Sequence, residues 1–246
     1  MRKMLVSVGR LLSFACLGLV FGAGFSAAHA YKVSPLVHNL SPAGKKAISF
    51  ITIDNTHDYP LTVEMTVERR TIVDGLVESD QPADDDFIVF PPQAIIQPGA
   101  KQRVQVRYIG QPTEKSEIYR LKVAQVPVSL EEQENARVEV AYNFIAAIYV
   151  APDNAKTDLS VTAIAPQENG SYAVTIENAG NYHALLTSFV WEATATDGTS
   201  AVLKADELPI QDVPFVEPFG KRTIILEKEI LGTLVGLSGL TIKEIK

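Results

Sequence analysis

The sequence predicts an all-β protein, with two β-sandwich domains in tandem after a cleaved signal peptide. Three observations support this fold class. Short runs rich in Val, Ile, Thr and aromatic residues recur between clusters of Pro, Gly, Asn and Asp. No segment after residue 30 has the periodicity of a convincing amphipathic helix. A Pro-containing break near residue 152 divides the strand-like runs into two groups.

Residues 1–30 have the three parts of a secretory signal peptide. A basic N-terminus is followed by the apolar run 11–25 and by Ala28-His29-Ala30, a small-x-small cleavage site. A membrane anchor needs about 20 unbroken apolar residues, whereas this run is short and contains glycines. We therefore expect cleavage after Ala30 and a mature chain that is not embedded in a membrane.

Composition restricts the class of protein further. The only cysteine, Cys16, lies in the predicted signal peptide, so the mature chain must fold without disulfides around a full-sized hydrophobic core. Residues 31–246 are long enough for one large β domain or two domains of immunoglobulin (Ig) size. The formal net charge of the whole chain is −7, and removing the basic signal peptide makes it more negative. This balance argues against nucleic acid as a partner.

The first half contains eight short strand-like runs, close to the seven strands typical of an Ig-like sandwich. The clearest is 61–67, in which apolar and polar residues alternate as they do in a half-buried strand. We interpret the acidic segment 78–86 as a solvated, mobile loop. The predicted strands are residues 33–36, 47–55, 61–67, 87–90, 94–96, 104–108, 118–126 and 138–150.

A domain boundary is predicted at Ala151-Pro152-Asp153-Asn154, because proline cannot continue a strand ladder. The domains would then be residues 31–152 and 153–246. Asn169-Gly170 between two alternating runs predicts a hairpin. The glycine-containing tail 231–246 suits neither a stable helix nor a clean strand, and a closing edge strand stays open. Strands in this half are expected at residues 159–164, 172–177, 185–196, 202–203 and 222–227.

No residue pattern indicates catalysis, a cofactor or a metal site. His38, His57 and His183 have neither metal-ligand spacing nor the spacing of a nucleophile and its base, so we interpret them as structural or surface residues. The chain has no nucleophile elbow, phosphate loop or His-Glu-x-x-His motif. Asp80 and the three aspartates 84–86 lack the spacing and the glycine of an EF-hand. We expect a protein that is not an enzyme.

Several motifs resemble the PapD-like periplasmic pilus chaperones. Phe87-Ile88-Val89-Phe90-Pro91-Pro92-Gln93 is followed by a Pro98-Gly99 turn and a basic strand that includes Val106-Arg107. Ser116-Glu117-Ile118-Tyr119-Arg120-Leu121, continuing to Gln125-Val126-Pro127, is similar to the next strand of that family. Residues 141–152 resemble the family's long last strand. The resemblance covers nearly all of the chain after residue 30 and is strongest over 87–152.

The resemblance implies a periplasmic chaperone that binds pilus or fimbrial subunits, lends them a strand and delivers them to an outer-membrane usher. Such subunits are Ig-like domains without their last strand, so they expose an unpaired edge. Residues 137–150 are the expected donor strand. Residues 128–136 are acidic and are expected to become ordered with the client. Self-association of the free protein through this strand stays open. The inserting side chains would be those of Val138, Val140, Tyr142 and Phe144, which otherwise pack the protein's own core.

The resemblance also implies a basic anchor for the client's C-terminal carboxylate. The better-known branch has one basic residue on the first strand and one on the last, but residues 33–38 and 144–148 contain neither Arg nor Lys. The archaic and alternate branches have an arginine after the tyrosine of the sixth strand, which matches Arg120. Arg120 and Lys122 would share one strand face, and a guanidinium suits a carboxylate best. Arg120 is the first candidate and Lys122 the second; the alternative is a solvated strand face.

Two other classes stay open from the sequence. One is a secreted Ig-like adhesin or pilus structural subunit that binds glycans, with Trp191, Tyr182 and Tyr172 as stacking residues, although a lone tryptophan is more often part of a core. The other is a secreted hydrolase on a β scaffold. The absence of a histidine-centred constellation argues against the hydrolase.

Overall fold

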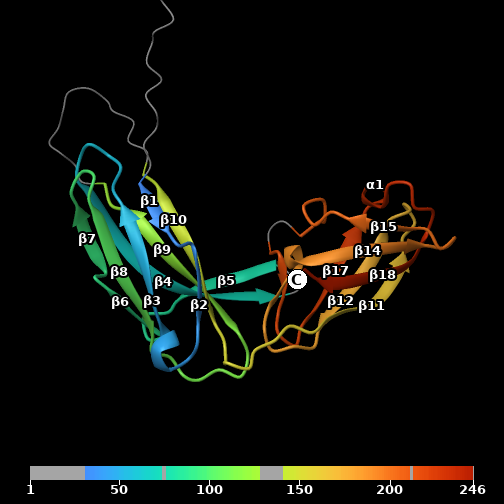
Figure 1. The fold of residues 1–246 in the computed structure, drawn as a ribbon, viewed down its shortest axis with the longest axis horizontal. Helices are drawn as coiled ribbons and strands as arrows, with labels where there is room; N and C mark the ends of the chain where they lie inside the picture. Colours follow the sequence, from blue (N-terminus) through green and yellow to red (C-terminus); the bar gives the residue numbers. More distant parts are fainter. Residues whose placement is uncertain (1–30, 74–75, 128–140, 211–212, 246) are drawn as a thin grey trace, which may run out of the picture. The chain divides into compact units, whose positions relative to one another are not determined.

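The computed structural model describes residues 31–73, 76–127, 141–210 and 213–245 (Figure 1). Residues 31–246 form one compact unit. The predicted signal peptide, segment 128–136, and Val138 and Val140 of the predicted donor strand lie outside the described residues. No helix in the described ranges is long and apolar enough to cross a membrane.

The first half of the unit is a sandwich of two sheets (Figure 1). One has the order β1-β3-β8-β6, and the other has the order β2-β10-β9-β4-β5 with β7 also paired to β4. A 3₁₀ turn, Gly44–Ala47, precedes β3. The strands are β1 (Lys32–Ser34), β2 (Val37–Leu40), β3 (Ile48–Asp54), β4 (Leu61–Val73), β5 (Leu76–Pro82), β6 (Phe87–Phe90), β7 (Gln93–Ile96), β8 (Lys101–Tyr108), β9 (Glu117–Gln125) and β10 (Asn143–Val150).

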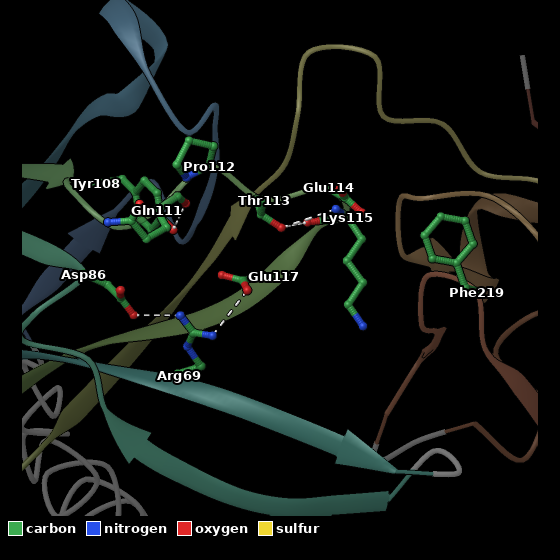
Figure 2. A pocket seen from close by; sticks show the side chains of 10 residues that line it. All are labelled: Arg69, Asp86, Tyr108, Gln111, Pro112, Thr113, Glu114, Lys115, Glu117 and Phe219. Atoms are coloured by element: carbon green, nitrogen blue, oxygen red, sulfur yellow. Dashed lines mark hydrogen bonds and ion pairs between the residues drawn. The ribbon is translucent and has the colours of Figure 1, made fainter.

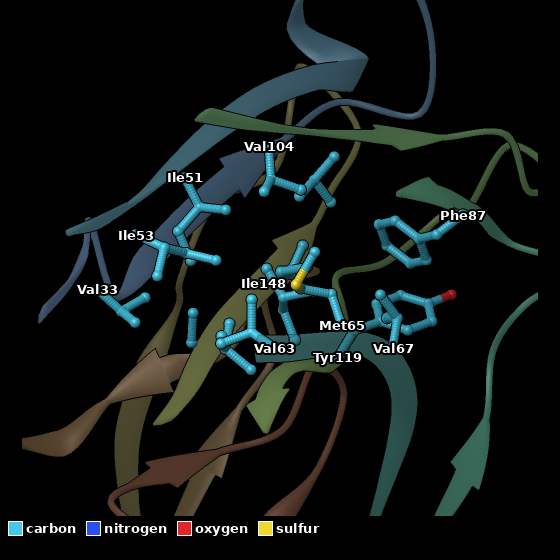
Figure 3. Packing of buried hydrophobic residues seen from close by; sticks show 14 of the residues in the cluster. Val33, Ile51, Ile53, Val63, Met65, Val67, Phe87, Val104, Tyr119 and Ile148 are labelled. Carbon is cyan, nitrogen blue, oxygen red and sulfur yellow. The ribbon is translucent and has the colours of Figure 1, made fainter. Parts of the chain in front are cut away.

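The core of this sandwich comes from alternate residues of both sheets (Figure 3). The alternation predicted for 61–67 is confirmed, because Leu61, Val63, Met65 and Val67 are buried while the residues between them are not. Burying each such side chain contributes about 1.5–3 kcal/mol. Residues of the four-stranded sheet that face them include Val33, Ile51, Ile53, Val104 and Phe87, while Tyr119 and Ile148 belong to the same six-stranded sheet and the same core.

The second half forms another β-sandwich, with sheets ordered β11-β12-β17 and β15-β14-β18 and a short pair β13-β16. Its core surrounds Trp191. The hairpin predicted at Asn169-Gly170 is confirmed, because β11 and β12 pair antiparallel and Gly170 has the positive φ of 82° that such a turn needs. The elements are β11 (Leu159–Pro166), β12 (Tyr172–Asn178), β13 (Ala184–Leu185), β14 (Phe189–Ala195), β15 (Ser200–Leu203), β16 (Phe215–Val216), β17 (Lys221–Leu226), α1 (Lys228–Leu231) and β18 (Leu237–Glu244). The domain boundary after residue 152 stays a prediction.

The prediction of one strand over 33–36 is wrong. β1 ends at Ser34 and pairs with β3, whereas β2 begins at Val37 and pairs with β10 in the other sheet. Pro35 lies between them and has no N–H to donate, so the first ladder ends there. The chain thus changes sheets within three residues, which places β2 alongside β10.

The prediction of a mobile acidic loop over 78–86 is wrong up to Pro82. This segment belongs to β5, which pairs antiparallel with β4 so that Asp80 lies opposite Arg70 and Gln81 opposite Arg69. Arginines on β4 offset the acidic charge, and this pairing makes a strand favourable. Composition alone could not reveal it.

Two further differences concern the second sandwich. The expected strand 185–196 is interrupted by a 3₁₀ turn at Leu186–Ser188, which separates β13 from β14. In the tail, a short helix α1 precedes β18, and β18 pairs with β14 from Phe189↔Glu244 to Ala195↔Leu237. The edge-strand interpretation of the tail is therefore the correct one.

Candidate functional site

Strand β10 has an edge that is only half paired within the described residues. On one side it pairs with β9 over its whole length, from Asn143↔Ala124 to Val150↔Glu117. On the other side β2 pairs only with Ala147–Val150. The N–H of Ala147 donates to the carbonyl oxygen of Leu36 at 2.8 Å. Because amide directions alternate along a strand, the N–H groups of Asn143 and Ile145 point to the same, unpaired side.

The two faces of β10 differ in character. Tyr142 and Phe144 are partly buried against the core of the first sandwich, whereas the Ile145 side chain is 51% exposed on the outer face. Two of the four predicted inserting residues therefore lie on the core side of the strand, next to its unpaired edge. At the beginning of β10, Tyr142 and Phe144 therefore pack against the protein's own core, and the main-chain edge beside them has no partner strand in the described residues.

Tyr31, the first residue after the predicted cleavage point, holds the beginning of this strand. Its hydroxyl oxygen lies 2.9 Å from the carbonyl oxygens of Val123 and Tyr142. Its ring meets that of Phe144 edge-on, with centroids 4.7 Å apart. Burial raises the pKa of Tyr31 to about 12, so the hydroxyl stays a donor at neutral pH. Sequence reasoning missed this residue, because contacts this distant in sequence leave no local signal.

Replacing Tyr31 by Phe should loosen the beginning of β10. The change removes the one hydroxyl proton that these two carbonyl oxygens share, a hydrogen bond worth about 0.5–1.5 kcal/mol, but keeps the ring contact with Phe144. We expect faster amide exchange at Phe144 than in the wild type, measured by hydrogen exchange. The matched control, Tyr172→Phe in the second sandwich, should leave Phe144 unchanged. Equal exchange in both variants would contradict a role for Tyr31.

Arg120 and Lys122 lie together on the outer face of the six-stranded sheet. They alternate on β9 with the buried residues Tyr119, Leu121 and Val123. Arg120 is paired with Ala147 on β10, within the segment 144–148 where the resemblance implies a lysine in the better-known branch. Lys122 pairs with Ile145, beside the unpaired edge. A basic group is therefore adjacent to the expected position, but on the neighbouring strand.

Two further charged residues, Asp80 and Arg70, lie beside Arg120 and Lys122. Arg120 Nη1 donates to Asp80 Oδ2 at 3.1 Å, and Asp80 lies opposite Arg70 in the β4–β5 pair. Burial, together with the nearby charge of Arg120, lowers the pKa of Arg70. Sequence reasoning missed both residues because it did not predict the β4–β5 hairpin; the two consecutive arginines 69–70 were the only signal.

A pocket of about 480 Å³ lies near another arginine, Arg69 (Figure 2). The Arg69 guanidinium donates to Asp86 at 2.9 Å and to Glu117 at 3.2 Å, and it lies 5.2 Å from the centre of the Tyr119 ring. Its charge is thus already compensated. Within the described ranges, no group of three or more His, Cys, Asp or Glu residues could hold a metal ion.

The three histidines in the described residues are His38, His57 and His183, and all three are buried. His38 Nδ1 lies 2.7 Å from Ser49 Oγ. The ring of His183 stacks on that of Tyr149 and is tilted by 39° from that of Tyr182, with both centroid distances 4.0 Å. The backbone N–H of His183 donates to Ser116 Oγ at 2.9 Å, and Nδ1 lies 3.2 Å from the same oxygen. His183 therefore joins the second sandwich to Ser116 and Tyr149 of the first.

The glycan-stacking alternative finds no support at its main residue. Trp191 is 0% exposed, and its Nε1–H donates to the carbonyl oxygen of Leu186 at 3.0 Å. Tyr172 is packed against the same core, and the ring of Tyr182 is in contact with that of His183. Trp191 is therefore a core residue.

Comparisons with known proteins agree with this architecture. Residues 40–156 match the family of the pili and flagellar-assembly chaperone PapD N-terminal domain. A search of curated proteins found no match. A chaperone–tip adhesin complex of CFA/I fimbriae biogenesis matches with 15% identity and a TM-score of 0.59, covering 89% of this chain and 92% of that one. The E. coli chaperone DraB matches with 15% identity and a TM-score of 0.57, covering 88% and 98%.

A third solved structure, Salmonella enterica SafA pilin with the SafB chaperone, matches with 15% identity and a TM-score of 0.56, covering 88% of this chain and 96% of that one. At these identities the likeness shows the fold, two tandem Ig-like sandwiches. The family that residues 40–156 match is one of non-enzymatic pilus assembly chaperones. Residues 40–156 belong to the family of PapD-like pilus assembly chaperones, as the motifs of residues 87–127 predict.

Proposed function

We propose that this protein is a periplasmic chaperone that binds and folds pilus subunits by donor-strand complementation and delivers them to an outer-membrane usher. The observation that carries this proposal is the edge of β10 at Asn143 and Ile145, which has no partner strand within the described residues. A subunit that lacks a strand has a complementary unpaired edge. Main-chain pairing between the two gives affinity, and alternate side chains give specificity.

The donor strand would place its apolar side chains in the groove that the client's missing strand leaves open. Tyr142 and Phe144 already lie against that core, and residues 137–141 would continue the strand with Val138 and Val140 on the same side. Four inserted apolar side chains stabilise the complex by roughly 6–12 kcal/mol before the costs of association. Segment 128–136 would become ordered at the same step.

Arg120 is the proposed anchor for the client's C-terminal carboxylate, with Lys122 as its neighbour. Its pairing with Ala147 supports this assignment, because a carboxylate bound there would fix the register of a client strand along β10. The same displacement of the basic group from the last strand to β9 supports membership of the archaic or alternate branch.

Similar solved structures also support pilus subunits as the partners. Two of the similar structures are complexes of a chaperone, one with a tip adhesin and one with a pilin. The signal-peptide pattern of residues 1–30 supports export. When no client is present, the unpaired edge of β10 would be available to a second copy of the chain, and self-association of the free protein belongs to this proposal.

Arg120→Ala should weaken client capture by roughly 10- to 100-fold, the range expected for losing hydrogen bonds to a charged group. The measurement is protection of a co-expressed pilus subunit from periplasmic proteolysis. Arg107→Ala is the matched control, because Arg107 is exposed on β8 in the other sheet. Undiminished subunit protection with Arg120→Ala would remove Arg120 from the mechanism, and the absence of any protected subunit in the wild type would contradict the proposed function.

A further inference from the structure

The proposed carboxylate anchor already has a carboxylate of its own. Asp80 Oδ2 lies 3.1 Å from Arg120 Nη1, and the side chains of Arg120 and Asp80 are only 27% and 25% exposed. Asp80 reaches Arg120 from β5, two strands away, across β4. This ion pair is therefore a partly shielded contact between an anchor residue and a separate strand of the same chain.

Two arginines and two carboxylates lie close together in this cluster, because Glu68 on β4 is opposite Arg120 in the β4–β9 pair. Arg70 lies opposite Asp80 in the β4–β5 pair and is close enough to Arg120 for the two guanidinium charges to repel each other. Arg70 Nε is buried and has no hydrogen-bond partner in the described part of the chain. Buried donors without partners are rare and costly. Asp80 is thus paired with Arg120, while the nearby Arg70 keeps a buried donor without a partner in the described residues.

We propose that Asp80 is an internal substitute for the client's carboxylate. In the free protein Asp80 neutralises Arg120; in the complex the client's terminal carboxylate takes its place on Arg120 and is held by Arg70 as well. The inference rests on the proposed function and adds to it a second anchor residue, Arg70, and an internal competitor.

The physical advantage of this arrangement is that the client's carboxylate can replace that of Asp80 while the charge of Arg120 stays paired. A partly buried guanidinium that loses its only partner is costly, but one carboxylate replacing another keeps the charge paired. Asp80 is tethered, so it competes at a high effective concentration. Only a carboxylate that strand pairing also holds in place would displace it. Asp80 would thereby raise selectivity for a chain end over carboxylates in solution.

The opposite role for Asp80 makes a different prediction. If Asp80 instead positions Arg120 for the client, removing its charge would weaken carboxylate binding. If Asp80 competes with the client, removing its charge strengthens binding. Asp80→Asn keeps the size of the side chain and removes the charge, so the sign of its effect separates the two roles.

The experiment follows the side-chain Nε–H signals of Arg70 and Arg120 by NMR while sodium acetate is added to the full mature chain. Sodium chloride at matched ionic strength corrects for screening. We expect acetate to bind Asp80→Asn about tenfold more tightly than the wild type, with both signals shifting together. Asp85→Asn, in the exposed acidic turn after β5, is the control for a general change in charge and should behave as the wild type.

Unchanged or weaker acetate binding in Asp80→Asn would overturn the proposal. A shift at Arg120 without one at Arg70 would overturn the assignment of Arg70. The double variant Asp80→Asn with Arg70→Gln should lose most of the gain, and retention of the full gain would also exclude Arg70. Acetate tests the cluster without any client, so this result is independent of whether the wild type captures a pilus subunit.

Discussion

Proline at position 145 should abolish client capture while the free protein stays folded. The N–H of Ile145 points to the side of β10 that has no partner before Ala147 within the described residues. Proline removes that donor and adds a ring where a client strand would approach. The ladder with β9 keeps its hydrogen bonds, because the amides of Phe144 and Ala146 point the other way. We expect client affinity to fall roughly 100-fold or more.

The measurement is co-purification of a co-expressed pilus subunit, with urea unfolding as the test of folding. Ile145→Ala is the matched control: it removes the same exposed side chain but keeps the N–H, so capture should persist. Ala146→Pro should instead destabilise the free protein, because it removes a donor to β9. Normal capture by Ile145→Pro would show that β10 does not pair with the client through this edge.

The fold was largely predictable because strand periodicity is local. Apolar alternation gave the strand at 61–67, and Asn169-Gly170 gave the hairpin between β11 and β12. What failed depended on partners distant in sequence. Pro35 marks a change of sheet only when β10 is available beside Val37, and the acidic segment becomes strand β5 only when β4 carries Arg69 and Arg70 opposite it.

In the candidate site, too, local features could be predicted from the sequence and long-range contacts could not. The two-residue spacing of Arg120 and Lys122 places them on one strand face whatever the fold, so sequence sufficed for that juxtaposition. Their position beside Ala147 and Ile145 requires the β9–β10 register. Asp80 and Tyr31 reach the site from parts of the chain that are far from β10 in sequence. Contacts between residues so far apart in sequence leave no pattern within a single segment, so only the structure shows them.

Lowering the pH from 6.5 to about 4 should destabilise the protein through His183. Burial lowers the pKa of His183 from 6.5 to about 4, and the residue is only 5% exposed. Between these values the unfolded chain binds a proton that the folded chain does not, so stability is full above pH 6.5 and falls as the pH decreases. The expected contribution is on the order of 3 kcal/mol. The neighbouring Tyr149 and Tyr182 stay neutral, since burial raises their pKa values.

His183→Phe isolates this contribution. The variant keeps an aromatic ring between Tyr149 and Tyr182 but cannot titrate, and it loses the ring contact with Ser116. We expect it to be less stable than the wild type at pH 7 and to lose less stability on acidification, as measured by urea unfolding at pH 7 and pH 4.5. His38, whose pKa burial also lowers, and the carboxylates remain in both proteins, so their effects cancel in the comparison. If both proteins lost the same stability between pH 7 and pH 4.5, burial would not keep His183 neutral in the folded state, and the prediction would be wrong.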